Sequence, residues 1–232
     1  MGTVLSAENR GRLAEVGVST LTTCLYRRGI RNAYLHGLVP VNTETRMVGE
    51  AFTMRFVPAR EDVTDMRDNL HQRAFDQCPA GAVLVIDAQR ELEACTCGDL
   101  LVARLKARGA AGIVTDGGFR DSAEIAQLGF PAYHARPVPP PSFLRLHAVA
   151  LNEPIGCARV AIYPGDIMVG DVEGVVVIPG AMANEIAEQA HELSQYDEFA
   201  AGQIQGGRSV VGLYPPTDAS RAEHAAWRKK KI

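Results

Sequence analysis

The hydrophobic pattern is clearest in the middle of the chain, where two short apolar runs flank an amphipathic stretch. Residues 82–86 (AVLVI) and 112–115 (GIVT) are continuous and mostly apolar, as expected of strands covered on both faces. Between them, residues 100–108 mix apolar and charged side chains with the spacing of a helix that buries one face. The order strand, helix, strand predicts a βαβ unit with parallel strands and a right-handed connection.

The rest of the chain continues this α/β pattern. Ser6 is a good N-cap for the first helix and Ser19 or Thr20 for the second, which Gly29 can end. Further helices are expected at residues 6–16, 19–29, 62–77, 122–128 and 181–200 and over the last 15 residues. Further strands are expected at residues 47–57, from 130, at 209–214, and as a hairpin at 167–169 and 175–178.

The composition is that of a globular protein. The 232 residues are 47% hydrophobic and 22% charged with a formal net charge of −3, so the chain can bury a large core. Neither value suggests a disordered chain or a nucleic-acid partner. The one basic run, Arg228 to Lys231, is interpreted as a solvated and frayed tail.

No segment resembles a signal peptide or has the length of a membrane span, so we expect a cytoplasmic protein without a membrane partner. The five cysteines include no CxxC, and we expect them to be reduced and mostly buried. Cys95 and Cys97 could bind a soft metal, but no second pair of cysteines or histidines stands nearby. The sequence contains neither HxH nor HExxH, which argues against a zinc hydrolase.

Residues 98–124 (GDLLVARLKARGAAGIVTDGGFRDSAE) gather the candidate chemistry, four acids and one arginine. They are Asp99, Asp116, Arg120, Asp121 and Glu124. Clustered carboxylates suit a hard cation such as Mg²⁺ or Mn²⁺, with Asp121 as direct ligand and Glu124 and Asp99 holding metal-bound waters. The same acids would also favour the N-terminus of the helix at 122–128, with Asp121 as its N-cap.

Two further observations favour a small anionic substrate such as a 2-oxo acid, and a third concerns how its carbonyl group could react. The guanidinium of Arg120 can bind a carboxylate through two bonds, although a surface salt bridge would explain it equally well. The helix that starts after Gly98 offers free N–H groups to an anion. Three of the four lysines lie in the tail and Lys106 lies on the charged side of a helix, so none suits a Schiff base. Carbonyl chemistry here would then need a metal ion as electron sink.

At these residues the chain resembles the 4-hydroxy-4-methyl-2-oxoglutarate/4-carboxy-4-hydroxy-2-oxoadipate aldolases. These are metal-dependent class II pyruvate aldolases that share a fold with the regulator of ribonuclease activity A. Gly98 stands 22 positions before Arg120, and Arg-Asp-x-x-Glu closes the motif. PAGAVLVIDA, GFPAYHAR and PGDIMVGDVEGVVVIP add support. The resemblance implies one α/β domain over residues 1–232, a β/β/α sandwich of the swivelling-domain type with its core at about 15–200. N-terminal helices and a C-terminal helical extension would flank this core and serve in oligomer contacts.

The resemblance also implies a role for each matching residue. Asp121 would bind the divalent metal, Mg²⁺ or Mn²⁺, and Arg120 would hold the keto oxygen of the pyruvyl group. Asp99 and Glu124 would order waters that act in catalysis. The substrate-binding residues would be Gly98, Leu100, Leu101, Arg120 and Asn69. The family assembles as trimers or hexamers, so the resemblance implies a homotrimer or homohexamer with active sites between subunits.

The chain departs from the family pattern at two places. The family often has Ser-Asp-Ala-Leu early in the chain, where this sequence has residues 22–25 (TTCL), without the acid. The family's histidine four residues after the asparagine is Arg73 here, although His71 is close. These positions would line the distal part of the pocket, so they concern the identity of the substrate more than the reaction.

The resemblance implies retro-aldol cleavage of a 4-hydroxy-2-oxo acid to pyruvate and a second carbonyl compound, with oxaloacetate decarboxylation as a side activity. Two alternatives remain. One is a non-catalytic protein that regulates ribonuclease E-type activity. The other is an aldolase for a sugar-derived 3-deoxy-2-oxo acid, whose polyhydroxy or dicarboxylate tail would face Arg27, Arg28 and Arg31. Those arginines would equally suit a solvated helix face.

Overall fold

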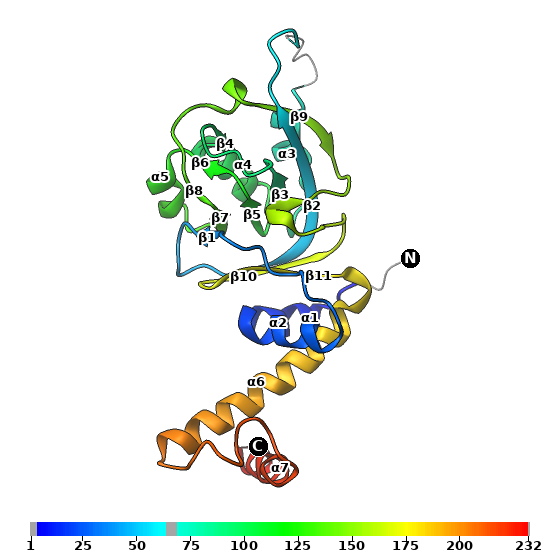
Figure 1. Ribbon diagram of the computed structural model, residues 1–232, viewed down its shortest axis with the longest axis vertical. Coiled ribbons are helices and arrows are strands. Elements are labelled where there is room, and N and C mark those ends of the chain that lie inside the picture. Colours follow the sequence, from blue (N-terminus) through cyan, green and yellow to red (C-terminus); the bar gives the residue numbers. More distant parts are fainter. Residues whose placement is uncertain (1–3, 64–68, 232) are drawn as a thin grey trace.

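The computed structural model describes residues 4–63 and 69–231. These residues form an eight-stranded mixed sheet and a separate three-stranded parallel sheet (Figure 1). The large sheet has the order β1–β7–β5–β3–β2–β10–β11, with β9 also paired to β2, and the small one has the order β4–β6–β8. The strands are β1 (Val39–Pro40), β2 (Met47–Pro58), β3 (Ala82–Asp87), β4 (Cys95–Cys97), β5 (Gly112–Thr115), β6 (Gly118–Phe119), β7 (Ala132–His134), β8 (Arg136–Pro137), β9 (Leu146–Leu151), β10 (Ile167–Asp171) and β11 (Gly174–Ile178).

Helices pack on both faces of the large sheet. The helices are α1 (Ala7–Glu15), α2 (Val18–Arg27), α3 (Leu70–Gln77), α4 (Asp99–Ala107), α5 (Ser122–Gln127), α6 (Ala183–Gln205) and α7 (Asp218–Lys231), with 3₁₀ turns at Ser142–Leu144, Cys157–Arg159 and Gly180–Met182. No helix within residues 4–63 and 69–231 is both long enough and apolar enough to cross a membrane.

Strand β3 lies at the centre of the large sheet and is buried on both faces. It pairs in parallel with β2 and with β5, which confirms the predicted βαβ unit. Val83 and Val85 point into the core formed with α1, α2 and α6, whereas Leu84 and Ile86 point into the core formed with α3, α4 and α5. Each such side chain stabilises the fold by about 1.5–3 kcal/mol when fully buried. This is why the β3 sequence is a continuous apolar run.

The small sheet positions the start of α4. Its strands β4 and β6 are parallel, and Cys97 lies opposite Phe119 in the register. The next residues along the chain are therefore Gly98 and Arg120, which leave the same edge of the sheet. The Arg120 N–H donates to the Cys97 carbonyl at 3.0 Å, which fixes the turn after β6 beside the start of α4.

The caps of the first two helices were predicted with mixed success. Ser6 accepts a hydrogen bond from the N–H of Asn9 at 3.1 Å and caps α1 as predicted. The predicted Ser19 or Thr20 cap of α2 was wrong, because α2 begins at Val18 and its N–H donates to the buried carboxylate of Asp171 at 2.9 Å. Asp171 lies at the end of β10, so this cap comes from a part of the sequence that local spacing cannot reveal.

Other predicted bounds also needed correction. The helix expected at residues 62–77 starts at Leu70, and residues 64–68 lie outside the described range. The strand expected at residues 209–214 was wrong, because that segment forms turns. The helix expected over the last 15 residues is confirmed as α7, and it continues to Lys231 through the basic run that was expected to be frayed.

Helices α6 and α7 form an arm with a small core of its own. Figure 1 shows α6 running away from the large sheet, with α7 at its far end. Tyr196, Phe199 and Leu213 are buried together there, and Trp227 of α7 packs against them. The Tyr196 hydroxyl donates to the Leu213 carbonyl at 2.6 Å, which holds the connection between the two helices against α6.

Candidate active site

Gly98, Arg120 and Asp121 lie against one another at the edge of the small sheet. Arg120 Nε donates to Asp121 Oδ2 at 3.0 Å. A Cβ added to Gly98 would stand 2.8 Å from that oxygen and 3.0 Å from Cγ of Arg120, closer than side chains normally approach. The φ of Gly98 is −119°, which any residue can adopt, so glycine is needed here for space. Gly98, at the start of the motif, is thus in direct contact with Arg120 and Asp121 near its end.

The side chain of Asp121 is not used to cap the helix that follows it. Asp121 occupies the N-cap position of α5 with φ +54°, but its carboxylate makes no capping hydrogen bond. This backbone conformation is uncommon for a residue with a Cβ, and such residues gather at functional sites. The side chains of Arg120 and Asp121 are 45% and 34% exposed, and an ion pair this exposed contributes at most about 1 kcal/mol. The predicted capping hydrogen bond from the carboxylate is therefore absent, although both acids, Asp121 and Glu124, do lie at the start of α5, where their charge favours the helix. The pair can open to a ligand at little cost.

The start of α4 presents backbone N–H groups beside this pair. The N-cap is Gly98, which has no side chain to bond them, and the first N–H groups of a helix have no partner inside the helix. Leu100 is 80% exposed, while Leu101 and Asp99 are half-buried. The helix dipole places partial positive charge here, so this edge of the sheet suits a carboxylate.

Two predicted carboxylates flank the site without contacting its central pair. Asp99 is the first residue of α4, and Glu124 is exposed in the first turn of α5. Within the described residues, neither forms a hydrogen bond or ion pair with Arg120 or Asp121.

Asn69 lies in a neighbouring hollow. It has φ +38° at the N-cap of α3, with no capping bond from its side chain, and lines a space of about 110 Å³ shared with Ser142 and Phe143. Burial raises the pKa of the Cys95 thiol. The positive charge of Arg120 and a hydrogen bond with the backbone of Ser142 both lower this pKa and partly oppose the rise. Ser142 is therefore shared between this hollow and Cys95, whereas neither Arg120 nor Asp121 lines the hollow.

Asp116 does not belong to this site, although it stands close in sequence. It is 2% exposed, and its two oxygens accept hydrogen bonds from the N–H groups of Ala88 at 2.7 Å and Ala158 at 3.0 Å. Burial raises the pKa of Asp116, and these backbone bonds partly oppose that rise. The acids that are close in the sequence therefore have two kinds of environment. Asp116 is buried and structural, whereas Asp99, Asp121 and Glu124 are accessible to solvent.

The donor set limits how a metal could be held. In the described part of the chain, no three His, Cys, Asp or Glu side chains lie together in a way that could hold an ion. An ion at Asp121 would have one protein carboxylate and would complete its coordination with water and substrate oxygens. Mg²⁺ is commonly held in this way, whereas zinc needs three or four protein ligands.

A buried histidine under the site was missed by the sequence analysis. The His134 ring stacks on Phe119 with centroids 5.2 Å apart, and its Nδ1 accepts the Phe119 N–H at 3.4 Å. Burial lowers the pKa of His134 to about 4, so the ring is neutral and supports the turn that carries Arg120. The signal available in the sequence was weak, a lone histidine at the end of a short strand.

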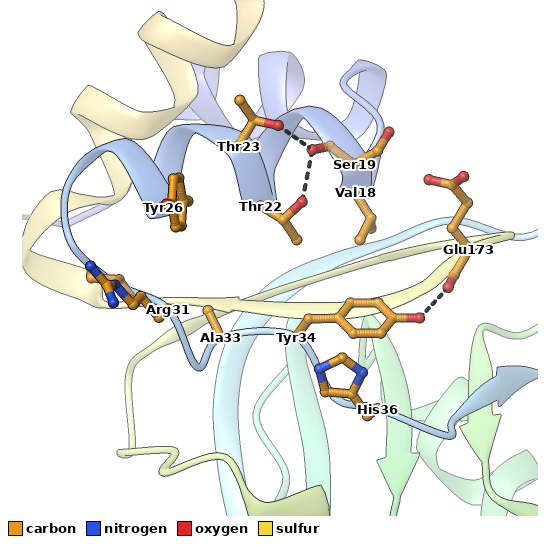
Figure 2. A pocket seen from close by; sticks show the side chains of 11 residues that line it. Val18, Ser19, Thr22, Thr23, Tyr26, Arg31, Ala33, Tyr34, His36 and Glu173 are labelled. Carbon is orange, nitrogen blue, oxygen red and sulfur yellow. Dashed lines mark hydrogen bonds between the residues drawn. The ribbon is translucent and has the colours of Figure 1, made fainter.

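A larger hollow of about 630 Å³ lies elsewhere, between α2 and the β10–β11 turn (Figure 2). Thr22 and Thr23, which stand where the family has Ser-Asp, line it and both donate to the Ser19 carbonyl. On its other wall the Tyr34 hydroxyl donates to the Glu173 carbonyl at 2.6 Å. None of its lining residues belongs to residues 98–124, so within this chain it is separate from the Arg120 site.

The three arginines considered for a substrate tail do not converge on one place. Arg31 lines the hollow of Figure 2, with its guanidinium 5.9 Å from the centroid of the Tyr26 ring. Arg28 pairs with Glu185 at 2.5 Å, and Arg27 faces a different crevice. Two of them therefore lie outside the hollow that Arg31 lines.

Comparison with known proteins identifies the family. Residues 18–177 match the RraA-like family, described as Aldolase/RraA. A relative from Halalkalibacterium halodurans, named "Putative 4-hydroxy-4-methyl-2-oxoglutarate aldolase", is 32% identical over 176 residues, which are 75% of this chain and 80% of the relative. A relative of the same name from Ectopseudomonas mendocina is 33% identical over 118 residues, which cover 50% of this chain and 71% of the relative.

Solved structures agree with this assignment. Streptomyces coelicolor RraAS2, described as an unusual member of the RNase ES inhibitor RraA protein family, matches with a TM-score of 0.76 and 32% identity over 87% of this chain and 99% of that one. An uncharacterized protein from Pseudomonas syringae pv. tomato shares the fold, with a TM-score of 0.84 and 24% identity over 92% of this chain and 95% of that one. The predicted fold class is confirmed, and the chain belongs to the RraA-like family.

Proposed function

We propose that this protein is a divalent-metal-dependent lyase that cleaves a 4-hydroxy-2-oxo acid, similar to 4-hydroxy-4-methyl-2-oxoglutarate, to pyruvate and a second carbonyl compound. Oxaloacetate decarboxylation is the expected side activity. The observation that carries the proposal is the meeting of a carboxylate, a guanidinium and a helix N-terminus at Asp121, Arg120 and Gly98. The aldolase names of relatives in the same family support it.

The site has complementary groups for the carboxylate and for the adjacent keto oxygen of a 2-oxo acid. The N–H groups of Leu100 and Leu101 bind the substrate carboxylate at the start of α4. Arg120 bonds Asp121 through Nε, and among the described residues its two terminal nitrogens have no other partner, so they can donate to the adjacent keto oxygen. Because the guanidinium is planar, its donors lie in one plane, which favours a fixed substrate orientation.

Asp121 would hold the divalent ion, Mg²⁺ or Mn²⁺. Its single accessible carboxylate fits a cation that keeps several waters and takes the rest of its ligands from substrate. When bound, such an ion supplies Lewis-acid polarisation of an oxygen in the substrate.

In the proposed reaction a base takes the proton of the C4 hydroxyl, the C3–C4 bond breaks, and a carbonyl group forms at C4. The electron pair of the broken bond moves into the pyruvyl unit, and negative charge develops on the C2 oxygen. Arg120 faces that oxygen and stabilises the charge. Asp99 and Glu124 hold the waters that remove the first proton and return one to C3, which gives pyruvate. Loss of CO₂ from oxaloacetate leaves the same anion.

We further propose that the active unit is a homotrimer or homohexamer whose neighbouring subunit covers this site. The Arg120–Asp121 pair is open to solvent within one chain. Leu100, Phe143 and Leu144 are 80%, 61% and 57% exposed, and such apolar groups favour a protein contact.

The test is a pyruvate-release assay over 4-hydroxy-2-oxo acids, a sugar-derived 3-deoxy-2-oxo acid and oxaloacetate, with Mg²⁺, Mn²⁺ or EDTA. We expect pyruvate from at least one hydroxy-oxo acid, loss of activity with EDTA, and recovery when metal is restored. If none of these substrates gave EDTA-sensitive pyruvate, the proposal would be wrong. The ranking of the substrates distinguishes a dicarboxylate aldolase from a sugar-acid aldolase.

A second candidate function is regulation of a ribonuclease E-type enzyme by protein contact, supported by the likeness to RraAS2. Such a regulator needs a surface and has no need of the Arg120 site. Inhibition of the ribonuclease that is equal for the wild type and for Asp121→Asn, together with no pyruvate release, would favour this second function.

A further inference from the structure

A crevice with an arginine-rich wall lies where α2, α6 and α7 meet, away from the proposed active site. Its volume is about 440 Å³. Arg27 reaches it from α2, and Arg221, His224 and Arg228 reach it from α7. The α7 residues follow the i, i+3, i+7 spacing of one helix face. Two separate elements thus direct cationic side chains at one concave space.

The arginines of this crevice are not neutralised by salt bridges. Over residues 4–63 and 69–231, Arg27, Arg221 and Arg228 make no ion pair within 4.0 Å and no side-chain hydrogen bond. In contrast, Arg28 on the same helix as Arg27 pairs with Glu185 at 2.5 Å. An arginine can therefore find a partner beside the crevice, while those on its wall are left available.

Among the residues that line the crevice, one is an acid, Glu192, and three are arginines. Asp197 does not line the crevice; burial raises the pKa of its carboxyl, and the charge of Arg27 lowers it. Burial lowers the pKa of His224, and the charge of Arg228 lowers it further, against a smaller opposing effect from the backbone of Gln195. The wall thus carries an excess of positive charge, and this charge contributes to the lowered pKa of His224.

We propose that this crevice binds a small polyanion with at least two carboxylate or phosphate groups, which bridges α2 and α7. The guanidiniums come from different elements, so a ligand with two separated anionic groups satisfies both sides, and guanidinium is the side chain best suited to grip such groups bidentately. The volume suits a small metabolite. The site lies outside residues 98–124, so it stands whether or not the proposed reaction is correct.

The chain carries its own probe for this site. Trp227 is its only tryptophan, and its ring lies 5.9 Å from that of His224. We expect citrate or pyrophosphate, added at constant ionic strength, to change the tryptophan fluorescence saturably, whereas chloride does not. In NMR spectra the bound anion should raise the pKa of His224, because a nearby negative charge favours the protonated ring. The tighter of the two probes identifies carboxylate or phosphate as the preferred group.

Substitutions at the wall separate this site from a general charge effect. Arg27→Gln and Arg221→Gln should each weaken binding of the tighter probe about tenfold, since each removes charge-assisted hydrogen bonds. Both side chains are exposed, so the variants should fold. Arg108→Gln removes the same charge from an exposed arginine at the end of α4, which does not line the crevice, and should change the midpoint by less than about twofold.

Three results would overturn the proposal. One is an unchanged midpoint in the Arg27→Gln/Arg221→Gln double variant. Another is an equal loss of affinity in Arg108→Gln, which would mean general electrostatic attraction. The third is binding of a long RNA with no binding of either small probe. As an independent readout, amide exchange in α7 should slow when the probe binds, because the anion ties that helix to α2.

Discussion

Asp116 and Asp121 are five residues apart and both follow short strands, yet they are used in opposite ways. Asp116 follows β5, is 2% exposed, and both of its oxygens accept backbone N–H groups. Asp121 follows β6, has a side chain 34% exposed, and has one oxygen bonded to an exposed arginine. Both residues are aspartates, so what separates their roles is how many of their carboxylate oxygens already accept hydrogen bonds from the protein backbone. A carboxylate whose acceptors are filled by backbone amides is structural, and one with free acceptors is available for chemistry.

The structural acid works together with a second one. Asp87 ends β3 beside Asp116, and its two oxygens accept the N–H groups of Gln89 at 3.0 Å and Gly156 at 3.2 Å. The residues around these bonds include several with positive φ, Ala158 at +50° among them. Two carboxylates thus fasten strained loops over the ends of two parallel strands.

The comparison predicts that the largest loss of activity follows removal of the charge at Asp121. Asp121→Asn keeps a residue that tolerates positive φ and removes the anionic ligand. We expect kcat for pyruvate release to fall about 100- to 1000-fold, the usual cost of losing one group that stabilises developing charge. The free energy of unfolding should change by less than about 0.5 kcal/mol, because the side chain is partly exposed. Steady-state kinetics with saturating Mg²⁺ and a urea titration measure the two quantities. Activity near that of the wild type would remove Asp121 from the site.

The opposite pattern is expected at Asp116. Asp116→Ala leaves the buried N–H groups of Ala88 and Ala158 without acceptors, each costing about 1–3 kcal/mol. We expect the free energy of unfolding to fall by about 2–4 kcal/mol in urea titrations, with kcat retained within about threefold under conditions where the variant is folded. A variant of wild-type stability that had lost its activity would place Asp116 in the chemistry and reverse the comparison.

The sequence predicted the core of the fold because the core depends on local patterns. The spacing shared with the family predicted that Gly98, Arg120 and Asp121 lie together, and the structure places them in contact. The apolar runs at β3 and β5 are visible in the chain, and a glycine 22 positions before an arginine marks where two parallel strands end together. The distinction between Asp116 and Asp121 was not visible, because it depends on Ala158, which is 42 residues from Asp116. The Asp171 cap of α2 is a contact across 153 residues, which no local spacing can reveal.

A smaller effect is expected from filling the space beside Asp121. Gly98→Ala adds a Cβ that would stand 2.8 Å from Asp121 Oδ2, and the flexible carboxylate can move aside. We expect kcat/KM to fall about tenfold, since a displacement of about 1 Å in a catalytic group is costly. The matched control is Gly11→Ala, because a Cβ there meets nothing within 4 Å and should leave activity unchanged. Equal activity of the two variants would show that the Gly98 contact is not needed for catalysis.

The smallest effect concerns the pH dependence of stability. In the folded state, burial raises the pKa of Asp116 above its ordinary value of 3.8. Folding therefore favours the protonated form of this carboxyl group. The stabilisation that comes from this preference is fully present below the pKa of Asp116 in the unfolded state. It is lost as the pH rises through the higher pKa of Asp116 in the folded state. Asp116→Asn cannot titrate and serves as the reference. We therefore expect the stability of the wild type relative to Asp116→Asn, from urea titrations at a series of pH values, to decline from pH 3.8 toward neutrality. If the wild type instead became more stable relative to Asp116→Asn as the pH rose, the two backbone hydrogen bonds would favour the charged form of Asp116 more strongly than burial opposes it.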